Sequence, residues 1–328
     1  MQRRVAEYIS LSASVAIVGK AMTTVSIFGG AGFLGRCLAR RLAAEGTTVR
    51  VAVRHLDQAR RVLRASGLER VTVFCADVRD QVAVAAAVAG TDAVVNAVSA
   101  YVETGGVTFQ AVHEQGAATL AREADAAGVA RFVLVSGVGA DPDSASAYIR
   151  ARGRGERVVQ QAFPGATIVR PSAMFGPGDA LFTTLAHLAR LLPVLPLIGG
   201  GCTRLQPVYV EDVAEAIARI LADPGTAGRT YELAGPAVYT LRELVTITLR
   251  LIGRQRLLVP VPFALAKLQA RLFEFLLPSP PLTTSQVDLL KANNVPSGTL
   301  PGLHELAIEP RAVEDIVHTY LGGSRGGA

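Results

Sequence analysis

A short glycine-rich segment limits the possible folds of this chain more than any other feature. The segment is Gly29-Gly30-Ala31-Gly32-Phe33-Leu34-Gly35. An apolar run of strand length, residues 25–28, precedes it, and a helical pattern, residues 34–45, follows it. Glycines at this spacing permit a tight turn, a close approach of the backbone to a ligand, and close packing of the helix on a sheet. The segment therefore predicts a strand–turn–helix unit whose first helical N–H groups receive a diphosphate.

Strand-like and helix-like patterns keep alternating after this turn. Further strands are expected at residues 49–53, 71–75, 93–96, 132–136 and 167–170, and helices at 56–65, 81–89, 109–127 and 148–162. This alternation is typical of βαβ units. It predicts an α/β fold of the Rossmann type, with a doubly wound parallel sheet.

The regular alternation of strand and helix patterns ends after Pro171, and prolines and glycines cluster between residues 177 and 201. Helices are expected at 210–221, 241–251, 263–277 and 311–321, with a short strand at 231–234. We therefore expect three parts. They are a leader or mis-annotated start at 1–22, a dinucleotide-binding Rossmann domain at 23–175, and a smaller C-terminal α+β substrate or partner region at 176–328, of which 206–235 rejoins the Rossmann core.

The first 21 residues leave two alternatives open. Arg3 and Arg4 precede a weakly apolar stretch, residues 9–18, which is the pattern of a poor signal peptide. The first strand begins almost directly after Met22, so a start there would leave a complete domain. We favour an over-extended start or a disordered leader over secretion.

Composition excludes several classes of protein. The mean hydropathy is +0.35, yet the apolar segment 181–198 is broken by two prolines and two basic residues and is no transmembrane span. The three cysteines form no CxxC pair, which is typical of a reduced cytoplasmic protein. The histidines have no metal-ligand spacing, so no metal is expected. The net charge of +6 fits either an anionic surface or a solvated arginine-rich surface, and no basic run interleaved with aromatic residues predicts nucleic-acid binding.

The end of the second expected strand indicates which dinucleotide binds. An NAD site usually has an acidic residue there, which bonds the ribose 2′-hydroxyl. This chain has Arg54, followed by Arg60 and Arg61, and its first acid, Asp57, begins the next helix. A guanidinium at this place pairs with a 2′-phosphate. NADPH is therefore the expected cofactor, with NAD as the alternative.

Four further segments match the short-chain dehydrogenase/reductase superfamily in its extended or atypical branch. They are Asp77-Val78, Asn96-Ala97-Val98, Arg170-Pro171-Ser172 and residues 206–213. The chain resembles this superfamily over roughly residues 24–235. The resemblance implies that cofactor is held by Gly29, Gly30, Ala31, Gly32, Phe33, Leu34, Gly35, Arg54, Asp77, Val78, Asn96, Ala97, Val98, Ser136, Tyr148, Arg152 and Pro171.

The same resemblance implies a catalytic serine and a Tyr-x-x-x-Lys pair. The chain offers Ser136 and Tyr148, but Arg152 stands where the family has lysine. An arginine four residues on lies on the same helix face, stays charged, and is expected to lower the tyrosine pKa. Guanidinium and ammonium are not interchangeable, however, so turnover by this trio is an open question.

A narrower resemblance covers nearly the whole chain. It is carried by the order of segments such as Phe163-Pro164-Gly165-Ala166, Gln206-Pro207-Val208-Tyr209-Val210, Val259-Pro260-Val261-Pro262 and Leu300-Pro301-Gly302-Leu303. This order is similar to the nucleotide-binding accessory subunit of respiratory complex I and its alphaproteobacterial homologues. That resemblance implies a structural NADPH, complex I subunits as partners, and a cytoplasmic place, peripheral to the inner membrane.

Three functions remain open at this point. The first is an accessory subunit of complex I with little or no turnover. The second is an active NADP-dependent reductase, epimerase or dehydratase, and the third is a redox-sensing NADPH binder. The expected helix at 263–277, rich in leucine and phenylalanine and carrying Lys267 and Arg271, suits either an anionic membrane surface and a partner subunit, or a lid over a substrate cleft.

Overall fold

A seven-stranded parallel sheet forms the centre of the molecule. The computed structural model describes residues 22–276 and 282–321. The strands of the sheet are β1 (Thr24–Phe28), β2 (Thr48–Val53), β3 (Thr72–Cys75), β4 (Ala93–Asn96), β5 (Arg131–Val135), β6 (Thr167–Pro171) and β11 (Thr230–Leu233). Their spatial order is β11-β6-β5-β4-β1-β2-β3, and every neighbouring pair is parallel. The order reverses between β1 and β4, where such folds hold their ligands.

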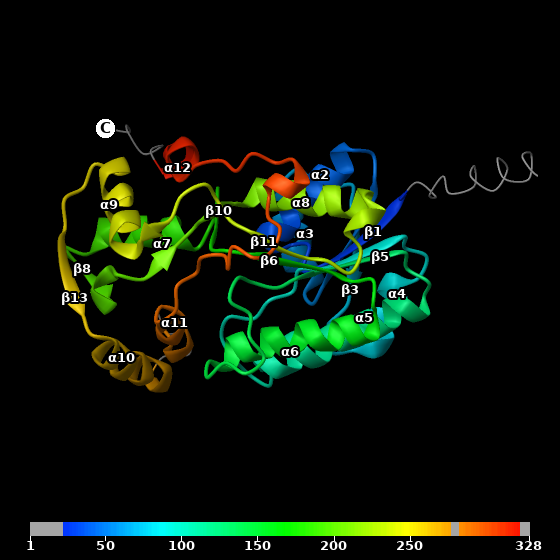
Figure 1. The fold of residues 1–328 in the computed structure, drawn as a ribbon, viewed down its shortest axis with the longest axis horizontal. Coiled ribbons are helices and arrows are strands. Elements are labelled where there is room, and N and C mark those ends of the chain that lie inside the picture. Colours follow the sequence, from blue (N-terminus) through cyan, green and yellow to red (C-terminus); the bar gives the residue numbers. More distant parts are fainter. Residues whose placement is uncertain (1–21, 277–281, 322–328) are drawn as a thin grey trace, which may run out of the picture.

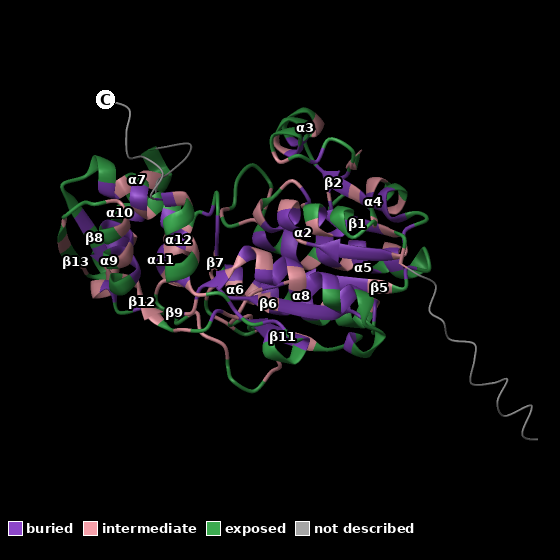
Figure 2. Ribbon diagram, turned by 90° about the horizontal axis from the view of Figure 1, so that it is seen from above, coloured by how far each residue is buried: buried purple, intermediate pink, exposed green. Residues whose placement is uncertain are grey.

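Helices cover both faces of this sheet (Figure 1). One layer contains α2 (Phe33–Ala44), α3 (Leu56–Ala65) and α8 (Val210–Ala222), and the other contains α4 (Gln81–Val88), α5 (Ala117–Ala126) and α6 (Ala147–Ala162). Alternate residues of β1 serve the two layers, since Val25 and Ile27 pack with α2 while Phe28 packs with α4 and α5. Both faces of the central strands are buried, as Figure 2 shows, whereas the edge strand β3 has no buried residue. The predicted doubly wound α/β fold is confirmed.

The helix expected over residues 109–127 differs from its prediction. Residues Gln110–Gly116 are π-helical, and only Ala117–Ala126 form a regular α-helix. The π-helical turns lie against α6 at very short range, because a Cβ on Gly155 would stand 1.9 Å from the carbonyl oxygen of His113. Single π-helical turns are frequent at functional sites. This segment carries His113 into the site described below.

A second, smaller lobe follows the sheet. Its helices are α7 (Leu181–Leu191), α9 (Leu241–Leu251), α10 (Phe263–Leu276), α11 (Thr284–Leu289) and α12 (Val313–Leu321). Its strands form three pairs: β7 (Met174–Phe175) with β10 (Val208–Tyr209), β9 (Arg204–Leu205) with β12 (Tyr239–Thr240), and β8 (Val194–Ile198) with β13 (Leu257–Val261). Short 3-10 turns occur at Gly199–Gly201, Pro224–Thr226 and His304–Leu306.

The pair β8–β13 was absent from the sequence expectations. Each strand contains a proline, Pro196 and Pro260, which argues against a strand in most contexts. A two-stranded sheet has only edge strands, so prolines are tolerated in it. In the described residues, no helix has both the length and the apolar character to cross a membrane. Residues 1–21 of the expected leader lie outside the described residues, and so does Leu277, the last residue of the helix expected at 263–277.

The chain returns across the molecule in a segment that we call the C-terminal strap, residues 293–320. Asn294 pairs with β9, and Glu232 in β11 donates its N–H to Pro301. Further along, Arg311 forms an ion pair with the buried carboxylate of Asp212. The strap thereby joins the sheet to the smaller lobe.

Candidate functional site

The glycine turn lies where β1 and β4 end side by side. Gly29 has a φ of +78°, and a Cβ there would lie 2.7 Å from the carbonyl oxygen of Ala97. A Cβ on Gly35 would lie 2.3 Å from the oxygen of Gly29. Gly32 differs, because a Cβ there would meet only the Gly29 oxygen, at 3.0 Å. Its open side, at the start of α2, has no side-chain cap on the helix N–H groups. The cradle therefore fits a diphosphate.

An arginine that the sequence reasoning overlooked supplies a positive charge at this turn. Arg36, in the first turn of α2, folds back and donates from Nη1 to the carbonyl oxygen of Ala31 at 3.0 Å. Its position, four residues after Gly32, was the available signal, because a residue at this spacing faces back along the helix toward the turn. Arg36 therefore adds to the attraction that the glycine turn offers to an anion.

The tips of β2 and β3 form the end of the site expected to hold the adenosine. Arg54 follows β2 and is exposed. The Asp77 carboxylate accepts two bonds from the Arg79 guanidinium, at 3.0 and 2.7 Å. These bonds hold the pKa of the Asp77 carboxyl below its usual value, and the nearby Arg54 charge acts in the same direction. Val78 is buried beside Gly116. Two guanidinium groups, one of them free of ion pairs in the described residues, thus stand at this end.

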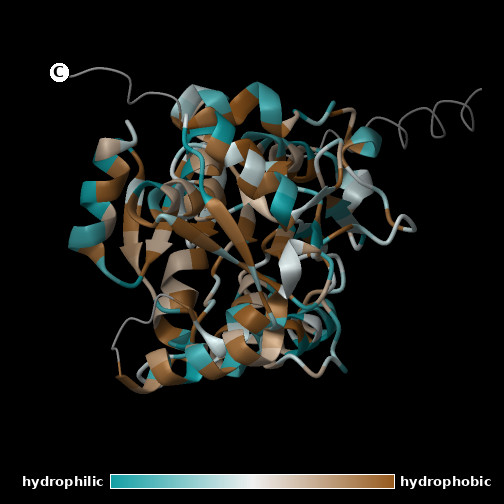
Figure 3. Cartoon of the chain, turned by 90° about the vertical axis from the view of Figure 1, so that its left-hand side faces the viewer, coloured by the Kyte–Doolittle hydropathy of each residue, from teal (hydrophilic) through white to brown (hydrophobic). Residues whose placement is uncertain are grey.

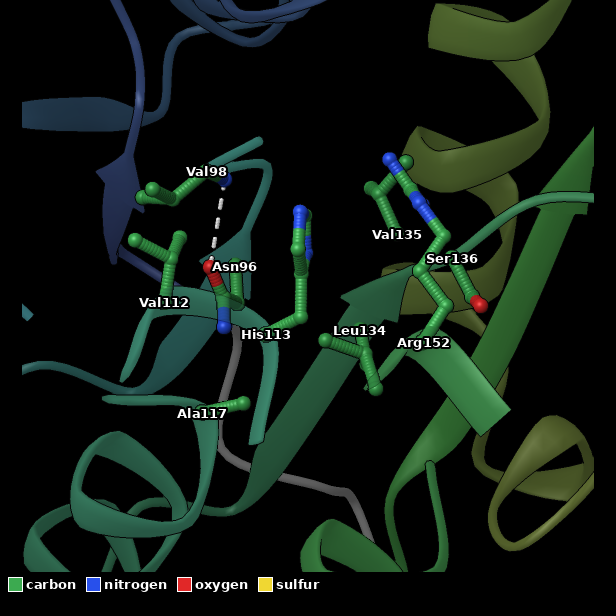
Figure 4. Close-up of a pocket in the computed structure, with 9 residues that line it drawn as sticks. All are labelled: Asn96, Val98, Val112, His113, Ala117, Leu134, Val135, Ser136 and Arg152. Atoms are coloured by element: carbon green, nitrogen blue, oxygen red, sulfur yellow. Dashed lines mark hydrogen bonds between the residues drawn. The ribbon is translucent and has the colours of Figure 1, made fainter. Parts of the chain in front are cut away.

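The turn after β4 forms the opposite wall of the cradle. Asn96 is buried, and its Oδ1 accepts the N–H of Val98 at 3.1 Å (Figure 4). The N–H of Ala97 donates to Phe28 in β1 at 2.9 Å. The amide side chain therefore shapes the turn itself and keeps residues 96–98 against the glycine turn.

Tyr148 and Arg152 lie one turn apart on α6 and contact each other. Arg152 Nε donates to the Tyr148 hydroxyl at 2.7 Å, and its Nη2 donates to Ser99 Oγ at 2.8 Å. The guanidinium carbon lies 5.0 Å from the centre of the Tyr148 ring. The arginine thus occupies the helix face expected from its spacing and is fixed by two hydroxyl groups.

Two buried polar atoms in this region have no hydrogen-bond partner among the described residues. They are Ser136 Oγ, at the end of β5, and Arg152 Nη1. Both residues line a small pocket that opens to solvent, and Asn96, Val98 and His113 also line it (Figure 4). Buried polar groups are normally paired, so these two atoms indicate the place of a polar ligand. Ribose hydroxyls and a carboxamide are groups that a serine and a guanidinium bind, and the residues present therefore fit a nicotinamide riboside.

The environment of Tyr148 opposes the effect expected from Arg152. Burial raises the pKa of the Tyr148 phenol to about 12, and the Arg152 charge lowers it by a smaller amount. The predicted lowering of the tyrosine pKa by arginine is therefore outweighed by burial. Because general acids work best with a pKa near the working pH, this phenol is a weak proton donor in the structure as it stands.

Aromatic rings enclose Tyr148. Tyr101 stacks on it with ring centres 5.6 Å apart, and Phe109 and His113 meet it edge-on at 5.4 and 5.5 Å. Leu289 from α11 packs against the same cluster. The smaller lobe therefore reaches the cluster that contains the tyrosine, and Tyr148 is buried.

His113 is one of the histidines whose spacing in the sequence indicates no metal site. The structure buries it in the wall of the pocket, with Nε2 3.0 Å from the carbonyl oxygen of Ala100. Burial, assisted by the Arg152 charge, lowers its pKa to about 3. The imidazole is therefore neutral at physiological pH. A lone histidine inside a helical pattern belongs to no motif. The only sequence signal for its burial was its place next to Val112, which is also buried.

The segment after β6, residues 172–179, lies between the site and the smaller lobe, and we call it the closing segment. Pro171 accepts the N–H of Val138 at 3.1 Å, which joins this segment to the residues after Ser136. Arg170, which belongs to the same motif, turns away and pairs with Glu156 at 2.6 Å. The N–H of Ala173 donates to Asn294 Oδ1 of the C-terminal strap at 2.6 Å. The closing segment is therefore held by both the sheet and the strap.

No metal centre accompanies this site in the part of the chain that the structure describes. No group of three or more His, Cys, Asp or Glu side chains is arranged to hold an ion among residues 22–276 and 282–321. The polar groups of the site come from serine, tyrosine, arginine and backbone amides, which suit an organic ligand.

The fold and the cradle define a dinucleotide-binding protein of the extended short-chain dehydrogenase/reductase type. A family model described as NAD(P)H-binding matches residues 29–224, and the chain belongs to this family. The dTDP-glucose 4,6-dehydratase DesIV of Streptomyces venezuelae has the same fold, with a TM-score of 0.70, 22% identity, and coverage of 91% of this chain and 96% of that one.

Two relatives place the chain more narrowly. NADH dehydrogenase (ubiquinone) 1 alpha subcomplex subunit 9 of Arabidopsis thaliana mitochondria is 34% identical over 307 residues, which are 90% of this chain and 76% of the relative. A ceramide reductase of Caulobacter vibrioides is 35% identical over 207 residues, which are 61% of each chain. The predicted resemblance to the complex I subunit is thereby confirmed as a relationship.

Proposed function

We propose that this protein is an accessory subunit of respiratory complex I that holds NADPH with little or no turnover of its own. The observation that carries the proposal is the similarity to the complex I subunit across 90% of the chain, which includes the smaller lobe as well as the nucleotide-binding part. The enclosed tyrosine supports it, because a phenol with a raised pKa, buried and stacked on Tyr101, is poorly placed to serve a substrate.

The residues of the cradle have separate roles in holding NADPH. Gly32 and the start of α2 would receive the diphosphate, with Arg36 beside them. Ser136 Oγ and Arg152 Nη1 would bind polar groups at the nicotinamide end. NADPH itself supplies a hydride when a substrate reaches it, and Tyr101, Tyr148 and the closing segment limit that access. The bound cofactor then stabilises the fold by mass action.

The preference for NADPH over NADH rests on Arg54, which stands exposed where an NAD site carries an acid. Changing Arg54→Ser is expected to weaken NADPH binding by about tenfold and to leave NADH binding unchanged, because only NADPH has the 2′-phosphate. Calorimetric titration measures both affinities. Arg122→Ser, on α5, removes an exposed arginine elsewhere and is the matched control. Equal losses for both cofactors would contradict this role.

Affinity purification from detergent-solubilised native membranes tests the accessory role. We expect the tagged protein to bring down complex I subunits together with tightly held NADPH. A preparation without complex I subunits would overturn the proposal. The NADPH content of the purified protein is measured separately, so loss of the partner and loss of the cofactor are distinguishable.

An NADP-dependent reductase is the second candidate. It is favoured by the direct bond between Arg152 and Tyr148 and by the similarity to a ceramide reductase over 61% of the chain. In this case Tyr148 would give its proton to a substrate carbonyl, and Ser136 would hold the carbonyl oxygen. Substrate-dependent NADPH oxidation that is abolished by Tyr148→Phe supports the reductase. Oxidation that continues at the same rate in the variant excludes this role of Tyr148.

A further inference from the structure

One helix of the smaller lobe exposes an apolar face that no described residue covers. On its inner side, α10 buries Ala266 and Ala270 against Val287 of α11. Its outer side carries large apolar side chains at the spacing of one helix face, and all are exposed: Leu265, Leu268, Leu272, Phe275 and Leu276. Phe275 is 86% exposed. A stripe of this size is unusual on a surface that meets only water.

The strand pair that leads into α10 extends this apolar surface. Val194 of β8 pairs with Leu257 of β13, and both side chains are exposed, as is Val259. The alternate residues Leu195 and Leu197 point inward and are buried. Figure 3 shows hydrophobic segments along these strands and along α10 below them. We call the exposed residues of α10, β8 and β13 the distal apolar face.

The segments that carry α7, α9, α10, α11 and the pair β8–β13 are rich in positive charge. Residues 181–205 and 236–296 contain nine lysines and arginines against three acidic residues, whereas residues 297–321, which include α12, contain one arginine and four acidic residues. Arg271 on α10, with Arg250 and Arg254 before β13, is exposed. Among the acidic residues near α10, Asp288 is paired with Lys267 and Glu274 is bonded to Thr284. The helix α12, which carries Glu314 and Asp315, lies at the opposite side of the lobe from α10 (Figure 1).

We propose that the distal apolar face lies on the surface of an anionic lipid bilayer, with α10 parallel to the membrane plane. A helix with a leucine and phenylalanine stripe flanked by arginine is suited to insert its apolar side into the headgroup region. Anionic headgroups complement the charge of the lobe. The proposal concerns the outer surface of the smaller lobe, which α11 separates from the cluster around Tyr148, and it goes beyond the proposed NADPH-holding role.

The shape of the surface supports a bilayer as its occupant. α10 lies at the edge of the lobe, and Figure 1 shows no other helix or strand on its outer side. A projecting helix presents a ridge, which a fluid lipid surface accommodates without a complementary groove. The inner contacts with α11, and the ion pair from Lys267 to Asp288, keep the apolar stripe turned outward.

Vesicle flotation with the full-length protein tests this surface. The probes are vesicles of phosphatidylcholine alone and of phosphatidylcholine mixed with phosphatidylglycerol. We expect binding to the mixed vesicles that weakens as salt is added. The double change Leu268→Gln and Leu272→Gln is expected to reduce this binding by about tenfold or more. Both residues are exposed, so the variant should fold. Val82→Gln, which alters an 80% exposed valine on α4, is the matched control.

Each outcome decides the proposal. Loss of vesicle binding in the α10 variant alone supports it. Failure of the unmodified protein to bind the mixed vesicles overturns it, as does equal binding by the α10 variant. If complex I is captured through α10 while vesicles are not bound, the face belongs to a protein contact and the bilayer is excluded. The NADPH-induced rise in melting temperature, measured on every variant, reports the cofactor site separately.

Discussion

Two glycines in the same turn have different physical reasons for being glycine. At Gly35 a side chain would collide with the backbone of Gly29, whereas at Gly32 it would enter the space left for the diphosphate. The first is a requirement of folding and the second is a requirement of binding. Single substitutions therefore separate the two properties within one turn.

Changing Gly32→Ala is expected to reduce NADPH affinity by at least about tenfold, because the added methyl enters the proposed diphosphate site. It is expected to destabilise the cofactor-free protein less than a change at Gly35 does, because the methyl meets the Gly29 oxygen at 3.0 Å rather than 2.3 Å. Changing Gly35→Ala is expected to destabilise the protein itself by about 1–3 kcal/mol through overpacking. Thermal melts with and without NADPH measure both effects. Equal loss of stability in the two variants would contradict this division.

His113 makes stability depend on pH in the acidic range. Its pKa is lowered to about 3 in the folded protein, against the ordinary value of 6.5, so the unfolded chain binds the proton first. Stability from this group is full above about pH 6.5 and is lost as pH falls toward 3. At pH 5.5 the loss amounts to about 1 kcal/mol.

Urea unfolding of the protein and of His113→Gln at pH 7.5 and 5.5 measures this contribution, since the side-chain amide of glutamine does not titrate. The unmodified protein is expected to lose about 1 kcal/mol more than the variant between the two pH values. An identical pH dependence of the two proteins would show that the pKa of His113 is the same in the folded and the unfolded chain.

Sequence reasoning at the residue scale succeeded where a motif fixes the local backbone. The glycine turn and the spacing of Tyr148 and Arg152 depend on neighbours along the chain, and the structure brings these residues into the positions expected. The pKa of Tyr148 depends on its burial among Tyr101, Phe109 and His113, which are distant in sequence. No local pattern carried that information, so the effect of Arg152 was overestimated.

At the scale of elements, the C-terminal strap is the connection between the cofactor site and the smaller lobe. Asn294 bonds Ala173 in the closing segment, and Tyr320 donates to Asp179 at 2.5 Å near the same segment. Asp179 also accepts the N–H of Gly176. Both ends of the closing segment are therefore held by residues that follow it by more than a hundred positions.

Changing Asn294→Ala leaves the N–H of Ala173 without its bond, which costs about 1–3 kcal/mol. Because this bond holds the closing segment, NADPH is expected to dissociate faster from the variant. Asn293→Ala removes a comparable bond to Arg204 in β9, outside the closing segment, and serves as the control. Stopped-flow displacement of NADPH gives the rates. An unchanged rate in Asn294→Ala would exclude the strap from cofactor retention.

Elements were predictable where amphipathic periodicity is regular and local. The strands and helices around the central sheet follow such patterns, and their predicted fold is confirmed. The pair β8–β13 joins segments about sixty residues apart, and each strand carries a proline. The π-helical turns of Gln110–Gly116 lie against Gly155 of α6. Both features involve contacts between distant segments, which periodicity does not record.

At the scale of the whole molecule, the nucleotide-binding part and the smaller lobe have separate apolar cores. One core surrounds Val25 and Ile27 beside the sheet, and another surrounds Phe175 and Phe182 in the lobe. The strap contributes to both, through Leu306 in the first and Val313 in the second. We infer that the two parts unfold together.

NADPH at a hundred times its dissociation constant is expected to stabilise the protein by about 2.7 kcal/mol. Because the strap couples the cores, calorimetry should record one transition that moves upward as a unit, by about 5 °C. The matched measurement uses NADH at the same concentration. Two transitions, of which NADPH moves only one, would contradict the coupling.

The prolines of β8 and β13 have a consequence for how this protein behaves at high concentration. Proline lacks the N–H that an incoming strand would need, and in sheets it stands where that missing donor faces outward. The sheet of β8 and β13 therefore exposes apolar side chains, but a strand from another molecule could not form a complete set of backbone hydrogen bonds with its edges. Replacing Pro196 and Pro260 would supply the missing N–H donors and favour aggregation through strand pairing between molecules, which the two prolines oppose in the native sequence.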